Sequence, residues 1–383
     1  MNNSQLPAVT LSAPVALDAM GGDFGVEVCV EGAVLAAKEM SIASILVGDE
    51  SKIRAALKNF KAENNPLLTV FHASEEIQME ESPSVAIRRK ADSSIRRAFE
   101  LAKQGKASGV VSAGNTGAVM AGGLLVLGTL PGIARPAIAS LIPKVGDGTP
   151  TVLLDAGANI DCHAYQLVQF ALMGSHYAES ALGCTRPRVG LLSNGSEASK
   201  GTDITRSAYV SLSEIKAINF IGYVEGNDIS QNVADVVVCD GFEGNIVLKS
   251  IEGAVELVFD TIQRYVQKTG RGKLGFWIAK PILKKVFHER LDPSAYGGAP
   301  LLGLNGNAIV CHGGSNSRSI MNGIRIAHKF AQEGLLSRIA SALTDVELQV
   351  PGAYEDGMWG RMGQRFTKQK KDKKKQAEAS SSK

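Results

Sequence analysis

The stretch Val15-Ala-Leu-Asp-Ala-Met-Gly-Gly-Asp23 places a short apolar run directly before a turn with two glycines, and an amphipathic stretch, Val26–Met40, follows. This order is typical of a buried strand that leads into a helix. An apolar run followed by a Gly/Asn turn and a helical stretch recurs at Val110-Val111, Val152–Asp155, Val189–Ser193, Val236–Asp240 and Ala308–His312. Strands that alternate with helices predict an α/β fold with three layers, α/β/α, around a mostly parallel sheet.

Three further segments were assigned from their patterns. Ile45–Gly48 and Leu67–His72 are expected to be strands, and Ser84–Gln104 one helix, because Ser82-Pro83 precedes it and Gly105 follows it. Ala107–Ala134 contains no charged residue and is long enough to span a membrane. Because a Gly/Asn turn and Pro131 interrupt it, we expect a strand and a short helix in a buried core.

The composition of the 383 residues, 44% hydrophobic and 21% charged, is that of an ordinary soluble globular protein and excludes disorder over most of the chain. The five cysteines are far apart and never form C-x-x-C, which argues against a disulfide framework or a zinc knuckle and favours a reducing cytoplasm. Because the first lysine is Lys38, no signal peptide is expected.

Basic charge is concentrated in two segments. Residues 361–383 contain nine Lys or Arg against two Asp or Glu, and residues 264–290 contain eight against one. Such segments are typical of contacts with anionic lipid, nucleic acid or an acidic protein, although the tail also fits a solubilising end. No aromatic residues interleave the tail lysines, which argues against nucleic acid. We expect a polar leader over 1–13, a folded domain over 14–346 and a basic low-complexity tail over 347–383.

Six strand-to-helix turns have similar compositions: Asp18–Asp23, Ser112–Gly117, Asp155–Asn159, Ser193–Gly201, Asp240–Asn245 and His312–Asn316. Ligands of α/β sheets bind at the carboxyl ends of strands, where glycine permits close approach and helix N-termini attract anions. The turns therefore predict a site for a phosphate or a polarised carbonyl, although any one alone is more often a tight loop. The chain lacks G-x-G-x-x-G, the P-loop, H-E-x-x-H and G-x-S-x-G, so no cofactor or metal is expected.

Lys200 is the only lysine within these turns, where it can neutralise phosphate or an oxyanion. The alternative is a solvated loop lysine. His312 ends a strand and fits acid–base work or a capping role equally well. Four aspartates could gather around magnesium, but capping and holding loop amides is the preferred interpretation. They are Asp18, Asp23, Asp155 and Asp240.

Longer motifs resemble the PlsX family, the acyl-acyl-carrier-protein (acyl-ACP):phosphate acyltransferases of bacterial phospholipid synthesis. They are Val15–Gly25, Val111–Ala118, Ala134–Ala139, Leu153–Cys162, Leu167–Ser175, Cys239–Ser250, Leu291–Gly306 and Cys311–Asn316. The resemblance covers about residues 15–334. It implies a homodimer with a phosphotransacetylase- and isopropylmalate-dehydrogenase-like fold, which transfers an acyl group from acyl-ACP to inorganic phosphate. It also implies a glycerol-3-phosphate acyltransferase downstream that consumes the acyl phosphate, and a cytoplasmic enzyme peripheral to the membrane.

The resemblance assigns catalytic roles to Lys200, for charge stabilisation, and Asn245, for hydrogen bonding to phosphate or the thioester oxygen; His312 follows as a third. The residues expected to bind substrate or phosphate are Gly21, Gly22, Asp23, Asn115, Thr116, Gly117, Asn159 and Gly244. Two turns depart from the family. Ser193-Asn-Gly stands where Asn-Ile-Gly is frequent, and His312-Gly-Gly-Ser where His-Gly-Ser-Ser is common.

The basic stretch predicts a helical hairpin over about 255–290. Gly270–Gly275 is expected to break the helix, Phe276, Trp277 and Ile278 to form an apolar tip, and Pro281 to open the second helix. Such a tip suits an anionic membrane surface. Acidic ACP or a dimer interface are the alternatives. For the protein as a whole, two rival functions are a phosphotransacetylase-like enzyme acting on acyl-CoA and a tail-driven nucleic-acid binder.

Overall fold

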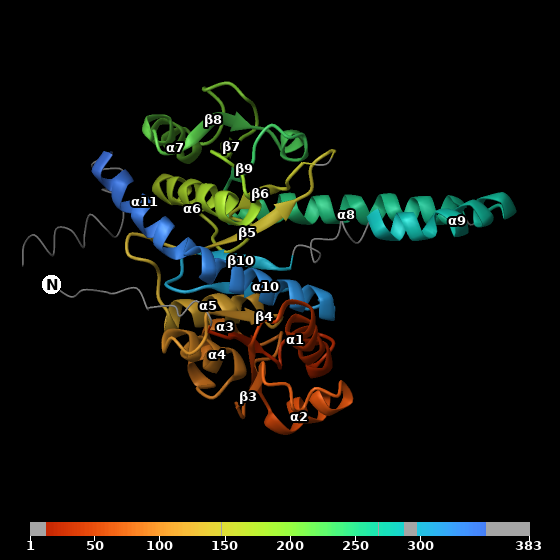
Figure 1. Ribbon diagram of the computed structural model, residues 1–383. Helices are drawn as coiled ribbons and strands as arrows, with labels where there is room; N and C mark the ends of the chain where they lie inside the picture. Colours follow the sequence, from red (N-terminus) through yellow and green to blue (C-terminus); the bar gives the residue numbers. More distant parts are fainter. Residues whose placement is uncertain (1–12, 147, 267, 287–296, 350–383) are drawn as a thin grey trace, which may run out of the picture.

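The computed structural model describes residues 13–146, 148–266, 268–286 and 297–349 (Figure 1). Within them, one sheet of eleven strands has the order β3-β2-β1-β4-β11-β10-β5-β6-β9-β7-β8. The strand bounds are β1 Val15–Asp18, β2 Ser44–Gly48, β3 Leu68–His72, β4 Gly109–Ser112, β5 Ala137–Ile142, β6 Thr151–Leu154, β7 Arg188–Leu192, β8 Asn219–Val224, β9 Val236–Val238, β10 Ala299–Leu302 and β11 Ala308–Val310. Most neighbours are parallel, as expected. The exceptions are the pairs β11–β10, β10–β5 and β5–β6, which are antiparallel.

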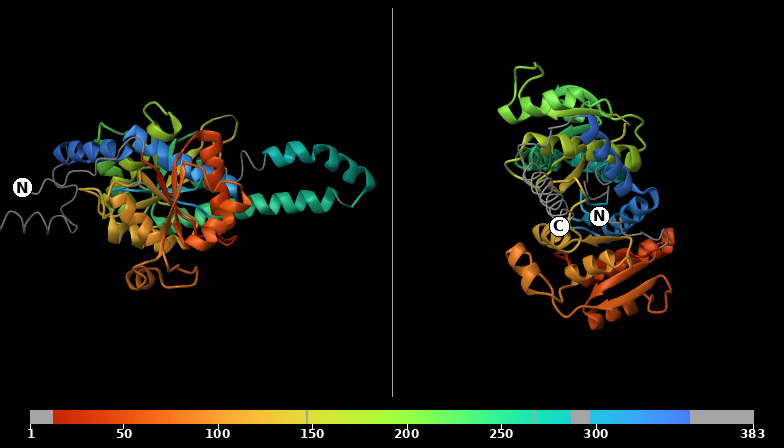
Figure 2. Two further views of the ribbon diagram at one scale, coloured as in Figure 1. Left: turned by 60° about the horizontal axis from the view of Figure 1, so that its bottom comes forward. Right: turned by 90° about the vertical axis from the view of Figure 1, so that its left-hand side faces the viewer.

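Helices cover both faces of the sheet, which confirms the three-layer prediction (Figure 2). One layer holds α1 Val26–Met40, α2 Glu50–Asn59, α6 Ala164–Leu182, α7 Asp203–Glu214, α10 Ser317–Glu333 and α11 Leu335–Gln349. The other holds α3 Pro83–Arg89, α4 Ser94–Lys103, α5 Thr116–Val126 and the start of α8 Gly241–Val266. No side chain of strands β1, β4, β6 or β9 is more than slightly exposed, so the core runs the length of the sheet.

The prediction for Ala107–Ala134 is confirmed, because this segment forms β4 and α5. No helix in the described ranges is long and apolar enough to cross a membrane. Strands β5, β8 and β10 were not anticipated. The expected leader and tail lie outside the described residues, apart from Ala13 and residues 347–349.

The single helix expected over Ser84–Gln104 is wrong, because α3 and α4 are separate. The break is made by tertiary contacts: the Ser94 N–H donates to the Glu75 carbonyl, at 3.0 Å, and Asp92 accepts from Ser74 Oγ at 2.6 Å. Lys90 Nζ adds a bond to the Glu76 carbonyl at 2.7 Å. A helix that continued through residues 90–93 would lose these bonds to the segment after β3.

The hairpin exists, but its expected tip is wrong. Helix α8 ends at Val266 and α9 Gly270–Val286 begins directly after the Lys268-Thr269 turn. Phe276, Trp277 and Ile278 therefore lie within α9, and Pro281 is inside this helix rather than at its start. The turn is closed by the Lys268 N–H, which donates to the Tyr265 carbonyl at 3.3 Å, so no glycine break is needed. Figures 1 and 2 show both helices side by side, projecting from the body.

At the opposite edge of the sheet from the turns, a buried ion pair joins β5 to β9. The Lys144 side chain is 1% exposed, and its Nζ lies 2.9 Å from Asp235 Oδ1. Arg188 Nε donates to the other oxygen at 3.0 Å. Although burial opposes it, the hydrogen bonds from Arg188 and Lys144 hold the pKa of Asp235 well below its ordinary value of 3.8. The ionised carboxylate is therefore part of the folded state.

We expect Asp235→Asn to lower the free energy of unfolding at pH 7 by about 3 kcal/mol, because it leaves Lys144 buried without its counter-charge. The depressed pKa means that the stabilisation is complete above the unfolded value and is lost as pH falls toward the folded value. Urea unfolding should therefore show the gap to the wild type narrowing below about pH 4. Glu50→Gln, which removes the exposed pair with Arg54, is the control and should change stability by less than about 0.5 kcal/mol. Equal losses from both variants would contradict the assignment.

Candidate functional site

A cavity of about 350 Å³ opens where the central strands end, and we call it the central cavity. Its walls are Thr116, Ile138, Ser140, Leu141, Ala156, Gly157, Asn245, Leu248, Glu252, Gly298, Ala299, Val310, Cys311, His312 and Ser315. Apolar side chains of β5, α8 and β11 form most of this lining, with a few polar groups among them. Ligand sites that hold an apolar group and fix one reacting end have this composition.

Three predicted residues meet at the central cavity from three separate turns. Thr116 is the first residue of α5, Asn245 lies in the first turns of α8, and His312 follows β11. The Asn245 amide and the Thr116 hydroxyl have no hydrogen-bond partner among the described residues, so both are free to bind a ligand. Each turn follows a different strand, and the sheet brings them together.

His312 is held in one tautomer. The Gly314 N–H donates to His312 Nδ1 at 3.1 Å, so Nδ1 is an acceptor. In the neutral imidazole the proton is then on Nε2, which becomes a hydrogen-bond donor for a ligand. Cys311 is different, since burial raises the pKa of its thiol to about 12 and keeps the thiol protonated. A thiolate nucleophile is therefore not part of this site.

The free N–H groups of helices supply positive potential here. Helices α5, α8 and α10 all begin at this edge of the sheet, and the free N–H groups belong to α5 and α10, because in α8 the N–H groups of Gly241 and Glu243 already donate to the Asn159 carbonyl and to Asp240 Oδ1. The first N–H groups of a helix lack partners within it, and together with the helix dipole they bind anions such as phosphate. No Lys or Arg is among the cavity's described walls. Glu252, two helical turns beyond Asn245 in α8, is the one carboxylate among these walls, so an anion bound beside Asn245 would meet backbone N–H groups and neutral side chains.

A buried carboxylate fixes the cavity wall. Asp155, with no exposed surface, accepts five hydrogen bonds. They come from the N–H groups of Ile138, Gly157, Ala158 and Asn159 and from Asn159 Nδ2, at 2.7 to 3.1 Å. Burial raises the pKa of Asp155 and these donors oppose the rise, and two oxygens that only accept are the pattern of an ionised carboxylate. Asp155 therefore holds loop amides, the preferred interpretation.

The first turn of α8 packs directly against the turn Asp155–Asn159. The Gly241 N–H donates to the Asn159 carbonyl at 2.7 Å. A Cβ at Gly244 would overlap the Asp155 carbonyl oxygen. The predicted residue Gly244 therefore permits close approach of the helix, which places Asn245 at the central cavity. It supplies no group of its own.

The side chains of Asn159 and Asn115 are engaged in the walls. Asn159 Nδ2 also donates to the Pro136 carbonyl at 2.8 Å. Asn115 Oδ1 accepts from the Ala118 N–H as the cap of α5, and its Nδ2 donates to the Met79 carbonyl at 2.7 Å. A Cβ at Gly117 would lie 2.6 Å from Pro83 Cγ, so Gly117 permits α3 to pack on α5. Direct substrate contacts by these residues remain predictions.

Gly21, Gly22 and Asp23 lie at a second cavity, of about 520 Å³. Its walls are Met20, Gly21, Gly22, Asp23, Gly25, Val26, Glu27, Lys52, Ala55, Glu76, Ile77, Gln78, Met79 and Gly114. We call it the switch-point cavity, because the strand order reverses here: β2 and β3 lie on one side of β1 and β4 on the other. No residue belongs to the walls of both cavities.

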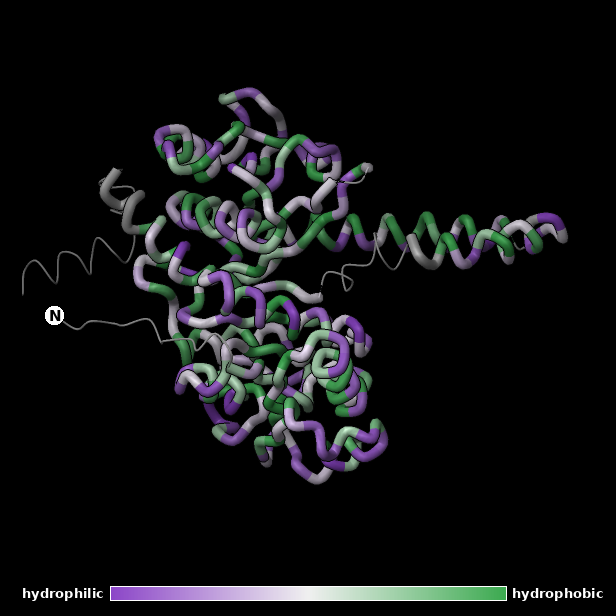
Figure 3. The backbone as a smooth tube through the Cα atoms, in the orientation of Figure 1, coloured by the Kyte–Doolittle hydropathy of each residue, from purple (hydrophilic) through white to green (hydrophobic). Residues whose placement is uncertain are grey.

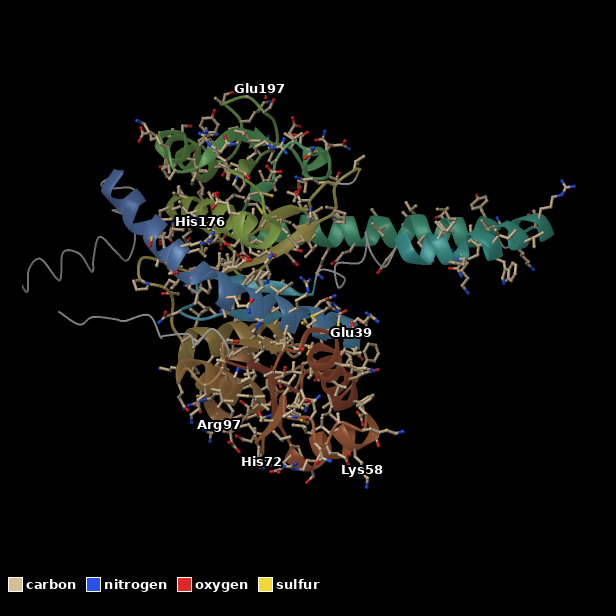
Figure 4. All side chains as sticks on the ribbon, viewed as in Figure 1. Glu39, Lys58, His72, Arg97, His176 and Glu197 are labelled. Carbon is tan, nitrogen blue, oxygen red and sulfur yellow. The ribbon has the colours of Figure 1, made fainter. Side chains whose placement is uncertain are left out.

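Lys200 lines neither cavity. It is exposed in the loop between β7 and α7, where its N–H donates to the Glu197 carbonyl at 2.9 Å. Figure 4 labels Glu197 at the outer end of this loop, away from the base of α8. The catalytic role of Lys200 stays a prediction. Among the described residues no group of His, Cys, Asp and Glu side chains could hold a metal ion.

Three polar wall residues were missed, and one of them, Glu252, lies in α8 beyond the predicted turn Asp240–Asn245. Ser315 is in the predicted turn His312–Asn316, whereas Ser140 lies in β5, which was not anticipated as a strand. The sequence signal for Ser315 was therefore present, since it shares a turn with two residues already singled out. No local signal marks Ser140.

This arrangement defines an α/β protein of the phosphotransacetylase fold with an anion-attracting, partly apolar site. Phosphotransacetylase from Streptococcus pyogenes is similar over 84% of this chain and 94% of its own, with a TM-score of 0.56 and 18% identity. The EutD phosphotransacetylase from Staphylococcus aureus is similar over the same shares, with a TM-score of 0.53 and 17% identity. At these identities the likeness concerns the fold alone.

The family follows from sequence. The model of the fatty acid synthesis protein family matches residues 13–338, and the chain belongs to this family, as the PlsX resemblance predicted. A phosphate acyltransferase from Pelotomaculum thermopropionicum is 47% identical over 338 residues, which cover 88% of this chain and 97% of that protein. A phosphate acyltransferase from Citrifermentans bemidjiense is 48% identical over 331 residues, 86% of this chain and 93% of that one.

We expect Gly244→Ala to lower the free energy of unfolding by about 3 kcal/mol or more, because the added Cβ would overlap the Asp155 carbonyl and push α8 from the sheet. Gly253→Ala on the same helix is the matched control, since nothing lies within 4 Å of its Cβ. It should stabilise the protein by up to about 1 kcal/mol, because alanine favours the helix. Denaturant unfolding followed by circular dichroism compares the two. Similar effects would contradict the close approach at Gly244.

Proposed function

We propose that this protein is a phosphate acyltransferase that moves a fatty acyl group from acyl-ACP to inorganic phosphate. The products are acyl phosphate and free ACP. The observation that carries the proposal is the central cavity, where apolar walls meet unpartnered amide and hydroxyl groups near the N-termini of α5 and α10. A fatty acyl thioester and a phosphate need this combination at one place. The family and its phosphate acyltransferase members support the same reaction.

In the proposed reaction, a phosphate oxygen attacks the thioester carbonyl carbon, so that an acyl–oxygen bond forms and the carbon–sulfur bond breaks. The phosphate is the nucleophile, and no Ser, Cys or His nucleophile is required. The helix N-termini and the Thr116 hydroxyl bind phosphate, while Asn245 Nδ2 donates to the oxyanion of the tetrahedral intermediate. His312 Nε2–H donates a hydrogen bond to the departing thiolate, which takes its proton from the attacking hydrogen phosphate. The walls position both reactants together.

The alternative is a phosphotransacetylase-like enzyme that uses acyl-CoA, which the fold of the structural relatives favours. Phosphate-dependent release of free thiol, measured with the same acyl group on ACP and on CoA, tests the choice. We expect the higher kcat/KM with acyl-ACP. A preference for acyl-CoA would favour the alternative. The acyl phosphate is unstable in water and must pass to a glycerol-3-phosphate acyltransferase, the proposed downstream partner.

The hairpin supports two further parts of the proposal, a homodimer and a peripheral membrane contact. Several large apolar side chains on it are exposed in the single chain: Leu257, Val258, Ile262, Tyr265, Leu274, Trp277, Ile278 and Ile282. Trp277 alone is 73% exposed. Figure 3 shows hydrophobic segments along the projecting hairpin. A face of this kind favours association with a second copy or with lipid. We propose a cytoplasmic enzyme that binds the inner membrane surface through Phe276, Trp277 and Ile278.

Asn245→Ala should lower kcat by about 100-fold or more without unfolding the protein, the scale of losing one oxyanion donor. Lys249→Ala, an exposed residue of α8 that does not line the cavity, is the control and should keep wild-type turnover. Phosphate-dependent thiol release from acyl-ACP measures all variants. Normal turnover in folded Asn245→Ala would remove this residue from the mechanism. Lys200→Ala decides the remaining role: a similar loss keeps Lys200 as a charge stabiliser, and normal turnover removes it.

Phe276→Ser with Trp277→Ser should release the protein from anionic vesicles while acyltransferase activity persists. Insertion of the apolar side chains contributes a few kcal/mol at most to the free energy of membrane binding, and each nearby Lys or Arg contributes about 1 kcal/mol. Because neither contribution is enough alone, loss of the apolar side chains should abolish binding. High salt should weaken wild-type binding in the same sedimentation assay. A variant that still binds vesicles but no longer dimerises would show that these residues form the dimer interface. If only deletion of residues 364–383 releases the protein, the tail is the anchor.

A further inference from the structure

The switch-point cavity has a wall that suits a neutral polar ligand. Three carboxylates, Asp23, Glu27 and Glu76, face one cation, Lys52, among its described walls. This charge balance disfavours phosphate groups and nucleotides. The remaining walls are four glycines, Gln78 and five apolar residues, Met20, Val26, Ala55, Ile77 and Met79. The glycine backbone and Gln78 can pair with amide groups, and the apolar residues can contact methyl and methylene groups. The cavity therefore fits a slender chain that carries amide and hydroxyl groups.

The same loops form walls of both cavities, with one cavity on each side. The Asp23 N–H donates to the Gly313 carbonyl at 2.9 Å, and Gly313 directly follows His312 of the central cavity. On the other side, Gly114 lines the switch-point cavity and Thr116, two residues further, lines the central one. Asn115, between them, donates a hydrogen bond to the carbonyl of Met79, which is another wall residue of the switch-point cavity. One loop thickness therefore separates the cavities.

Glycines, which carry no side chains, line the boundary between the two cavities. The backbones of Gly21 and Gly114 approach so closely that a Cβ on Gly21 would lie 2.5 Å from the Gly114 nitrogen. A Cβ on Gly313 would lie 2.9 Å from the Asp23 carboxylate oxygens. Because these glycines carry no side chains, the rim between the two cavities presents backbone N–H and carbonyl groups to a ligand that lies across it.

We propose that the switch-point cavity binds the pantetheine arm of the thioester substrate. This inference rests on the proposed function, in which the thioester sulfur sits at the central cavity beside Asn245 and His312. Every acyl-ACP and acyl-CoA carries the same pantetheine arm on that sulfur, a neutral chain with two amides, a hydroxyl and two methyl groups, whose phosphate ester at the far end stays outside the acidic cavity. Its N–H and O–H groups donate to the carboxylates of Asp23, Glu27 and Glu76, and the glycine backbone pairs with its carbonyls. In this assignment, the acyl chain and the phosphate bind in the central cavity, and the pantetheine arm binds in the switch-point cavity.

Ala55→Trp tests the assignment, because Ala55 lines the cavity from the exposed side of α2, so a larger side chain fills the cavity and leaves the core intact. Three thioesters of one fatty acid are compared: acyl-ACP, acyl-CoA, and the N-acetylcysteamine thioester, which lacks most of the arm. In Ala55→Trp, the ratio of kcat/KM for each full-arm substrate to kcat/KM for the truncated one should be about tenfold lower than in the wild type. The change should come from a higher KM for the full-arm substrates. Free pantetheine should compete with acyl-ACP in the wild type and lose this inhibition in the variant.

Ser51→Trp, an exposed residue of α2 that does not line the cavity, is the matched control and should leave the ratios unchanged. A loss restricted to acyl-ACP would place the carrier protein, not its arm, against α2 and overturn the assignment. Unchanged ratios in Ala55→Trp, with all three substrates turned over, would also overturn it while the proposed function stands. If the wild type releases no thiol from any of them, the proposed function fails and this inference falls with it.

Discussion

The site depends on the buried carboxylate of Asp155, which accepts hydrogen bonds from the backbone of one strand and of the turn after its neighbour. Asp155 joins the N–H of Ile138 in β5 to three consecutive N–H groups of the turn after β6. A buried charge is tolerated only when its oxygens are fully paired, and here five donors meet that requirement. Because the turn is fixed, the Asn159 carbonyl can anchor the Gly241 N–H, and α8 starts where Asn245 reaches the central cavity.

The central cavity attracts anions without a cation in its described walls. Helix N-termini supply partial positive charge that is already oriented, so no side chain must reorganise as charge develops on the thioester oxygen. Neutral amide and hydroxyl groups add specific hydrogen bonds, and apolar walls lower the local dielectric, which strengthens both effects. The switch-point cavity is more acidic, with three carboxylates against one lysine, whereas Glu252 is the one carboxylate among the described walls of the central cavity. Two adjoining cavities of different polarity can therefore sort the parts of one long substrate.

Much of the fold was predictable, because each buried strand leaves a local signal. An apolar run placed the strand Val15–Asp18 to the residue, and a glycine turn and helical spacing predicted a helix around Val26–Met40. The errors lie where distant contacts decide. Lys90 and Ser93 interrupt an otherwise helical stretch because they bond the segment after β3. Strand β5 depends on antiparallel partners from elsewhere in the chain, and the hairpin tip was misplaced because Pro281 is accommodated within α9.

The sequence by itself determined the α/β class, the family and the turns, five of six of which line the two cavities, because strand ends, glycines and amides are local and appear in order along the chain. Only the tertiary structure decided which turns meet. It brought Thr116, Asn245 and His312 to one cavity, placed Gly21 and Asp23 at another, and left Lys200 on an exposed loop. Asn115 and Asn159 look like ligand-binding amides in sequence, yet their side chains tie backbone segments together. Such outcomes depend on strand order in the sheet, which places turns far apart in sequence side by side.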